Sequence, residues 1–341
     1  MKRMKTEDAV GQVLCHDITQ IIKGVTKDAV FRKGHIITRE DIPVLLSVGK
    51  EHVYIWENDD SMLHENEAAE MLRDMCMGDH MQATLPKEGK IELIAQCDGL
   101  FLVDVERLRT VNSLGRMMIA TRPSGVPVKK GDKLCGTRII PLLIEKEVMA
   151  QAQKLAGEKP LMELLPIKQK KYGVITTGSE VEKGLIQDTF TPVIQQKMEE
   201  YGCEMLWHTV LGDEPGKITA AALNMLKQGA QLVICTGGMS VDPDDRTPLA
   251  IKNTGAQVVS YGAPVLPGAM FLLAYTEQGI PICGLPGCVM YAQRTIFDIV
   301  LPYLLAEVRV TAQQLAGLGN GGLCLNCDEC HYPNCGFGKG R

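Results

Sequence analysis

The sequence predicts an α/β protein in which a doubly wound parallel-sheet domain follows a smaller β-rich and α+β region. Three observations predict this fold. Strand-like apolar runs alternate with helical patterns in the second half of the chain, the run LVICT has no polar alternation, and three such runs end in glycine-bearing turns. A strand without polar alternation is buried on both faces, as in a parallel sheet covered by helices.

The first half of the chain divides into three predicted parts. We expect an α+β region over residues 1–60, a helical linker over 61–84 and a β-rich domain with a crossing helix over 85–168. In the first part, helix signals run from Thr38 to Val48, with acidic residues in the first turn. In the linker, apolar residues at helical spacing predict an amphipathic helix. These residues are Ala68, Met71, Leu72 and Met75.

The β-rich domain is predicted from short apolar runs separated by turns between Ile91 and Ile144. The tetrapeptide KKGD at residues 129–132 fits the turn of a β-hairpin. Residues 145–157 then predict a helix that ends at Gly157, because glycine commonly follows the last turn of a helix.

The larger domain, residues 169–308, shows the alternation of strands and helices that produces a parallel sheet. Asp213 is a candidate cap for one helix, since Pro215 follows in its first turn. The expected elements, in order, are a strand at 172–176, a helix with Ile194, Met198 and Tyr201, a strand at 205–210, a helix with Ile218, Ala222 and Met225, a strand at 232–236, a hairpin at 270–284, and a final helix with Val289, Ala292, Ile296 and Val300 on one face.

The composition excludes several classes of protein. The 341 residues are 45% hydrophobic and 23% charged, which is typical of a globular chain. The 41 Asp and Glu outnumber the 36 Lys and Arg without a basic stripe, so we expect no nucleic-acid partner. No apolar stretch approaches the roughly 18 residues of a membrane span. The N-terminal residues MKRMKTEDAV become polar where a signal peptide would have its apolar segment. We therefore expect a cytoplasmic protein that binds no membrane.

Three glycine-bearing turns mark the candidate site. They are TTGSE at 176–180, CTGGMS at 235–240 and GLPGC at 284–288. The carboxyl ends of parallel strands border the ligand crevice of an α/β sheet, and free backbone N–H groups there attract anions. The turns therefore predict a phosphate-bearing ligand. The motifs of P-loop and dinucleotide-binding proteins are absent from the sequence, which disfavours those two classes.

Acidic residues follow the same predicted strands. They are Glu180, Asp213, Asp242, Asp244 and Asp245. Carboxylates beside an anionic ligand repel it unless they hold a divalent cation or bond to its neutral parts. The sequence therefore predicts either Mg²⁺ or a ligand with hydroxyl and ring N–H groups. For Asp213, a cap and a site residue are equally good interpretations.

These motifs carry a resemblance to a known family. TTGSE, Gly212-Asp213, CTGGMSVDPDDRT and GLPGC stand in the order and spacing of the molybdenum-cofactor biosynthesis domain. MoeA-type molybdopterin molybdenumtransferases, MogA-type adenylyltransferases and CinA-type proteins share this domain. The resemblance covers residues 171–306. The opening AVGQVLCHDIT and the segment FRKGHIITREDIPVLLSVGKEHVYIW resemble MoeA-type chains more loosely, and the long insert of those chains is missing here.

The resemblance implies a cleft for molybdopterin or its adenylylated form, with molybdate and Mg²⁺ as further ligands. It implies catalytic roles for Asp245, Glu180 and Asp213. It also implies a molybdoenzyme as recipient, and a homodimer. The residues that it assigns to ligand binding are Thr177, Gly178, Ser179, Thr236, Gly237, Gly238, Ser240, Asp242, Gly284, Pro286 and Gly287.

Departures from the family pattern keep other functions open. Family members usually carry lysines where this chain has Gly262, Leu266 and Ala269, and the usual glycine after SV is Asp242. Each lost charge-assisted hydrogen bond weakens anion binding by roughly 1 to 3 kcal/mol. The first hypothesis is a MoeA-like molybdenumtransferase. The alternatives are a non-catalytic cofactor carrier or redox-sensing delivery protein, and a CinA-like nucleotide pyrophosphatase.

Four of the twelve cysteines crowd into the tail, residues 309–341, and we expect the other eight to be reduced thiols. The four are Cys324, Cys327, Cys330 and Cys335. The consecutive two-residue gaps resemble the ferredoxin-type cluster motif, although the last gap is four residues and not three. Zinc knuckles are usually separated by a dozen residues or more. We therefore predict an iron–sulfur cluster ahead of Zn²⁺.

Overall fold

The computed structural model describes residues 2–22, 24, 26–55, 59–240, 242 and 245–340. The chain forms two compact units. One contains Met1–Ile94, Asp104–Thr121 and Lys133–Met162; the other contains Ala95–Val103, Arg122–Asp132 and Glu163–Arg341. None of the helices in the described part of the chain combines the length and the apolar composition that a membrane crossing demands.

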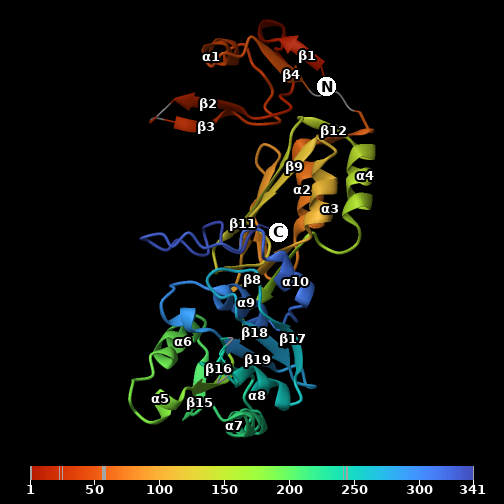
Figure 1. The fold of residues 1–341 in the computed structure, drawn as a ribbon. Coiled ribbons are helices and arrows are strands. Elements are labelled where there is room, and N and C mark those ends of the chain that lie inside the picture. Colours follow the sequence, from red (N-terminus) through yellow and green to blue (C-terminus); the bar gives the residue numbers. More distant parts are fainter. Residues whose placement is uncertain are drawn as a thin grey trace. The chain divides into compact units, whose positions relative to one another are not determined.

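The first unit contains small antiparallel sheets and the helices that pack on them (Figure 1). Strand β1 pairs with β4, β2 with β3, and β5 with β12, while β6, β7, β11 and β9 form a four-stranded sheet in that order. Its elements are β1 (Lys2–Lys5), η1 (Thr6–Asp8), β2 (Ile18–Ile22), β3 (Thr26–Phe31), α1 (Asp41–Ser47), β4 (His52–Ile55), β5 (Met62–His64), α2 (Glu65–Cys76), β6 (Met81–Ala83), β7 (Lys90–Ala95), α3 (Val105–Asn112), β9 (Met117–Thr121), β11 (Lys133–Ile139), β12 (Leu143–Glu145) and α4 (Lys146–Ala156).

The second unit is built around a six-stranded sheet with the order β15-β14-β16-β19-β18-β17. The first four strands are parallel, and β18 and β17 are antiparallel to their neighbours. A separate three-stranded sheet has the order β10-β8-β13. The unit's elements are β8 (Gly99–Val103), β10 (Val126–Val128), β13 (Met162–Pro166), β14 (Lys171–Thr177), α5 (Ser179–Glu182), α6 (Phe190–Glu199), β15 (Glu204–Leu211), α7 (Pro215–Lys227), β16 (Leu232–Thr236), α8 (Thr247–Asn253), β17 (Gln257–Tyr261), β18 (Leu272–Tyr275), β19 (Pro281–Leu285), η2 (Gly287–Met290), α9 (Ile296–Leu305) and α10 (Ala312–Gly317).

Helices cover both faces of the six-stranded sheet (Figure 1). Val174 and Ile234 face the core shared with α6 and α9, and their neighbours Ile175 and Val233 face the core shared with α7 and α8. All four side chains are fully buried, which explains why these strands lack polar alternation. The predicted doubly wound α/β fold is therefore confirmed, with an antiparallel edge added by β17 and β18.

A buried ion pair joins the two helices on one face of this sheet. The Lys197 Nζ atom on α6 lies 2.8 and 2.9 Å from the carboxylate oxygens of Asp298 on α9, and it donates to the Gln293 carbonyl at 2.7 Å. Both side chains are almost completely buried. The contacts hold the last turn of α6 against the core helix α9. The start of α6, at Phe190, borders the site described below.

Three sequence predictions need correction. Residues 105–112 form helix α3, where only strands were expected; Asp104 caps it by accepting from the Arg107 N–H at 3.0 Å. The KKGD turn connects β10 to β11, but these strands belong to different sheets and form no hairpin. The final helix begins at Ile296, because Thr295 and Asp298 form a capping box; Val289 lies in η2 and Ala292 precedes the helix.

Candidate functional site

The four parallel strands end at one edge of the sheet, beside a cavity of about 1170 Å³. Ten residues that the sequence analysis singled out line this cavity. They are Thr177, Gly178, Ser179, Glu180, Asp213, Gly237, Gly238, Ser240, Asp242 and Asp245. Asp244 lies outside the described residues. The turns after β14, β15 and β16 therefore border one space, as the sequence predicted from their positions after strands.

Four other predicted site residues are not among the residues that line the cavity. They are Thr236, Gly284, Pro286 and Gly287. A Cβ atom at Gly284 would lie 2.6 Å from Met239 Cε, so this glycine lets β19 pack under the Met239 side chain. Pro286 and Gly287 lead into η2, whose last residue, Met290, does line the cavity. The GLPG turn thus contributes through a methionine that the sequence analysis had not singled out.

Asp213 holds the turn after β14. Its Oδ2 atom accepts hydrogen bonds from the backbone N–H and the hydroxyl of Ser179, both at 3.0 Å. The N-cap residue of α7 is Glu214, one position later, and it makes no side-chain capping bond. Of the two interpretations of Asp213, the structure supports a residue of the cavity wall rather than a helix cap.

The loop after β16 depends on two glycines with left-handed backbone. Gly237 has φ +80°, and a Cβ atom there would lie 2.2 Å from the Thr177 carbonyl oxygen. Gly238 has φ +54°, and its Cβ would lie 2.7 Å from Thr247 Oγ1. The loop closes where the Ser240 N–H donates to Asp245 Oδ2 at 2.7 Å. A side chain at either glycine would displace the loop from the strand tips.

Hydrogen bonds from threonine hydroxyls hold this loop against the strand ends. Thr177 Oγ1 donates to the Thr236 carbonyl at 3.0 Å, and Thr247 Oγ1 donates to the Gly237 carbonyl at 2.9 Å. The two hydroxyl oxygens lie 3.1 Å apart. Tyr261 adds a hydrogen bond from its hydroxyl to the Met239 carbonyl at 3.1 Å. The sequence analysis did not single out Thr247 or Tyr261 as site residues. Thr247 ends the quoted motif CTGGMSVDPDDRT, whereas Tyr261 lies outside it.

The side chains that line the cavity carry mainly negative charge. Its described lining contains six carboxylates and two cations. The cations, Lys217 and Arg246, were not predicted, and the Lys217 Nζ atom lies 2.8 Å from Glu214. The hydrogen bond and charge of Glu214 raise the pKa of Lys217. The carboxylates are Glu180, Glu182, Asp213, Glu214, Asp242 and Asp245. These carboxylates repel an anion unless a divalent cation lies between them or they bond to neutral parts of the ligand, and oxygen ligands of this kind suit Mg²⁺.

Apolar side chains complete the cavity wall. Phe190 at the start of α6, Ile186 before it and Met290 from η2 all line the cavity. Ile186 is 55% exposed, and the Thr189 hydroxyl donates to Met290 Sδ at 2.9 Å. These side chains provide a surface on which a planar ring could pack, next to the carboxylates and the glycine loop.

Asp188 was also missed by sequence reasoning. Its carboxylate accepts from the Phe190 and Thr191 N–H groups at 2.9 and 3.1 Å, and from the Thr176 hydroxyl at 2.9 Å. His208 Nε2 lies 3.2 Å from the same carboxylate. Burial by itself raises the pKa of Asp188. The hydrogen bonds from Thr191, Thr176 and Phe190 together lower this pKa by more than burial raises it, so that the net shift is downward.

We expect Asp188→Ala to lower the free energy of unfolding by about 1 to 2 kcal/mol at neutral pH, because the first two N–H groups of α6 lose their acceptor. A carboxyl whose pKa is lowered by folding stabilises the protein above its unfolded pKa, and this contribution disappears as pH falls through the lower folded value. The difference from the unmutated protein should therefore shrink below about pH 4. Urea denaturation at several pH values measures it, with Asp188→Asn as the control that keeps an acceptor. A difference that is equal at acidic and neutral pH would contradict this role.

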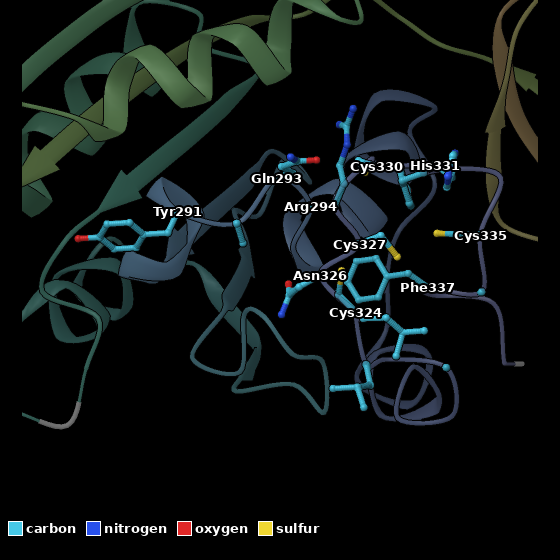
Figure 2. A pocket seen from close by; sticks show the side chains of 16 residues that line it. Tyr291, Gln293, Arg294, Cys324, Asn326, Cys327, Cys330, His331, Cys335 and Phe337 are labelled. Atoms are coloured by element: carbon cyan, nitrogen blue, oxygen red, sulfur yellow. The ribbon is translucent and has the colours of Figure 1, made fainter.

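The four tail cysteines line a second cavity, of about 520 Å³ (Figure 2). Its other wall includes Tyr291 and Arg294, from the segment between η2 and α9. Within the described ranges, no three His, Cys, Asp or Glu side chains gather closely enough to hold one metal ion. This applies both to the tail cysteines and to the described carboxylates of the first cavity.

A family model decides the relationship of the second unit to known proteins. Residues 173–306 match the model described as "Probable molybdopterin binding domain". This α/β domain belongs to the MoeA/MogA/CinA family. The match contains the whole glycine loop and all the described carboxylates of the first cavity. Residues 3–57 match a second model, described only as a domain of unknown function.

Relatives of the MoeA/MogA/CinA domain include two kinds of curated protein. A molybdopterin molybdenumtransferase from Synechococcus elongatus is 28% identical over 203 residues, which are 55% of this chain and 48% of that protein. A CinA-like protein from Mycobacterium tuberculosis is 37% identical over 77 residues, 23% of this chain and 18% of that protein. The chain thus spans about half the length of the first relative and less of the second.

Two solved structures match part of this chain. The tungsten cofactor synthesizing protein MoaB from Pyrococcus furiosus is 20% identical, with a TM-score of 0.35, over 42% of this chain and 99% of that one. The molybdopterin biosynthesis enzyme MoaB from Thermus thermophilus is 21% identical, with a TM-score of 0.35, over 42% of this chain and 98% of that one.

Proposed function

We propose that the first cavity binds molybdopterin or its adenylylated form, and that the protein takes part in molybdenum insertion during cofactor maturation. One observation carries the proposal: the glycine loop and the carboxylates of a MoeA/MogA/CinA domain line one cavity at the strand tips. Its volume of about 1170 Å³ is sufficient for a phosphorylated pterin.

In this proposal, different residues of the cavity bind different parts of the ligand. The glycine loop at Gly237 and Gly238 approaches the phosphate, since these two residues carry no side chain. Phe190 and Met290 pack against the pterin ring. One or two of the carboxylates of Asp213, Asp245 and Glu180 would hold Mg²⁺ together with the phosphate. The ion would neutralise phosphate charge and polarise the phosphorus.

Hydrogen bonds orient two of these carboxylates. Asp213 and Asp245 are each held by hydrogen bonds from a neighbouring serine, at 2.7 to 3.0 Å, so their side chains are oriented before a ligand binds. Both of the hydrogen bonds to Asp213 reach its Oδ2 atom. Preorganised carboxylates lose less entropy when they bind a cation.

The experiment incubates the purified full chain with adenylylated molybdopterin, molybdate and Mg²⁺. The proposal expects release of AMP and formation of cofactor that reactivates a molybdoenzyme lacking it, and it expects both to stop when Mg²⁺ is chelated. Absence of AMP and of active cofactor, under conditions in which a MoeA-type transferase produces both, would reject catalysis of molybdenum insertion.

A second candidate is a carrier that binds molybdopterin or finished cofactor without turnover. The charge of the cavity favours it, because one of its two described cations, Lys217, is already paired with Glu214. Retention of pterin fluorescence on the protein without AMP release would support the carrier. Hydrolysis of ADP-ribose would instead support the CinA-like pyrophosphatase.

We also propose a second cofactor, an iron–sulfur cluster or Zn²⁺, bound by the four tail cysteines. Thiolates are soft ligands that select such metals and not Mg²⁺ or Ca²⁺. The recipient molybdoenzyme, the homodimer and the cytoplasmic location stay predictions from the sequence.

A further inference from the structure

The cysteine-rich tail is docked on the α/β domain by backbone hydrogen bonds. Leu266 and Leu323 form a parallel bridge, in which the Leu266 N–H donates to the Gly322 carbonyl and the Cys324 N–H donates to the Leu266 carbonyl, both at 2.8 Å. The first cysteine of the run is therefore held by the domain. Its position does not depend on the tail alone.

Two aromatic residues anchor the rest of the tail in the core around α9. The hydroxyl of the half-buried Tyr332 donates to the Asp298 carbonyl at 2.9 Å, and the guanidinium carbon of Arg294 lies 5.3 Å from the centre of the Tyr332 ring. Burial raises the pKa of Tyr332 well above its usual value. Phe337, 5% exposed, packs in the same core. The chain is thus fixed before, within and after the cysteine run.

One of these anchors lies in the gap before the last cysteine. Tyr332 donates to the Asp298 carbonyl, and both Tyr332 and Cys335 line the cavity. A ferredoxin-type motif has three residues in this gap, and here there are four.

The four thiols surround a space and do not converge on a point. All four cysteines line the cavity of about 520 Å³, and Figure 2 shows the Cys327 and Cys335 sulfurs directed into it. A zinc ion with bonds of about 2.3 Å would place its four sulfurs only about 3.8 Å apart. In the described part of the tail, no three candidate ligands are gathered in this way.

We infer that Cys324, Cys327, Cys330 and Cys335 ligate one cubane iron–sulfur cluster, each thiolate binding a different iron. The inference rests on the proposed tail cofactor and names its class. Cysteines around a cubane stand farther apart than those around a single ion, because the irons occupy the corners of a cube. A cavity of about 520 Å³ accommodates such a core, whereas a single ion needs about the volume of one water, roughly 30 Å³.

The environment of the thiols fits this assignment. Cys324 and Cys335 are half-buried, and Cys327 and Cys330 are exposed. The half-buried pair would partly shield one side of the cluster from solvent, and the exposed pair would leave the other side accessible for assembly and for electron exchange. Apolar residues of the tail, Leu323 and Leu325, line the same cavity and are 63% and 79% exposed.

The test is anaerobic reconstitution of the full chain with ferrous iron, sulfide and a thiol reductant, in parallel with Zn²⁺ alone. We expect about four iron and four sulfide per chain and the broad visible absorption of an iron–sulfur cluster, bleached by dithionite. Cys330→Ala should lose most of this iron and sulfide. The matched control is Cys97→Ala, a partly exposed cysteine outside the tail, which should keep both.

One equivalent of zinc bound tightly, with no stable incorporation of iron and sulfide, would overturn the cluster assignment. Equal loss of iron and sulfide in Cys97→Ala and Cys330→Ala would overturn the ligand set. Neither readout depends on pterin. Failure of the cluster and failure of molybdopterin binding at the first cavity are therefore distinguished.

Discussion

Gly237→Ala is expected to destabilise the protein by about 3 kcal/mol or more. The added Cβ atom would lie 2.2 Å from the Thr177 carbonyl oxygen, far inside van der Waals contact, and φ is +80°. Left-handed backbone costs a non-glycine residue roughly 1 to 2 kcal/mol, and overpacking costs roughly 1 to 3 kcal/mol more. Neither cost is relieved by a side-chain rotation, because the obstructing atom belongs to the backbone of β14. Urea denaturation followed by circular dichroism measures the difference.

Gly287→Ala is the matched control for this substitution. Gly287 also belongs to a glycine turn at the end of a parallel strand, but a Cβ there meets nothing within 4 Å. We expect its free energy of unfolding to change by no more than about 0.5 kcal/mol. If Gly237→Ala were as stable as Gly287→Ala, the described packing of the loop against β14 would be wrong.

Asp245→Asn is expected to weaken Mg²⁺-dependent pterin binding or turnover by about 100-fold. Asparagine has nearly the same shape and its side-chain oxygen can still accept from the Ser240 N–H, which now donates to Asp245 at 2.7 Å. The loop should therefore keep its conformation, while the negative charge needed to hold a cation is lost. Isothermal titration with molybdopterin, with and without Mg²⁺, measures binding, and the melting temperature reports the fold.

Glu277→Gln is the control for the change in net charge. Glu277 is exposed, lies in the turn between β18 and β19, and does not line the cavity. We expect its Mg²⁺-dependent binding to equal that of the unmutated chain. Equal affinities for Asp245→Asn and Glu277→Gln would remove Asp245 from the proposed site, even if the cavity still bound pterin.

The sheet and its ligand edge were predictable from the sequence for a physical reason. Strands buried on both faces, such as Leu232–Thr236, must be apolar throughout, and this pattern is local in the sequence. Glycines after strands are local too. Once the strands are parallel, their ends meet at one edge, and Thr177, Asp213 and Ser240 line one cavity as a consequence of topology.

Other features depend on contacts between distant residues and escaped sequence reasoning. Gly284 is required by Met239, and the Asp188 carboxylate is placed by Thr176 and His208, far from it in sequence. Arg246 was not predicted as a cation of the cavity, because it directly follows a stretch of acidic residues. Helix α3 and the start of α9 were missed although both carry local signals, since Asp104 and Thr295 are good N-cap residues.

The tail likewise has some features that are local in the sequence and others that depend on contacts between distant residues. Its cysteine spacing is a local pattern, and the spacing by itself predicts a metal site. The anchoring of Tyr332 beneath Arg294 and Asp298 is not local, and only the folded domain reveals it. The spacing suggests the class of ligand set, and the folded structure adds that the four thiols line one cavity, which the inferred cluster would occupy.

The most direct measurement is hydrogen exchange of the full chain titrated anaerobically with molybdopterin and Mg²⁺. We predict saturable binding that slows exchange at residues 177–182 and 237–240, and that leaves the first unit unchanged. No binding, or protection confined to segments away from these turns, would contradict the claim that the strand tips of the α/β domain form a pterin cleft.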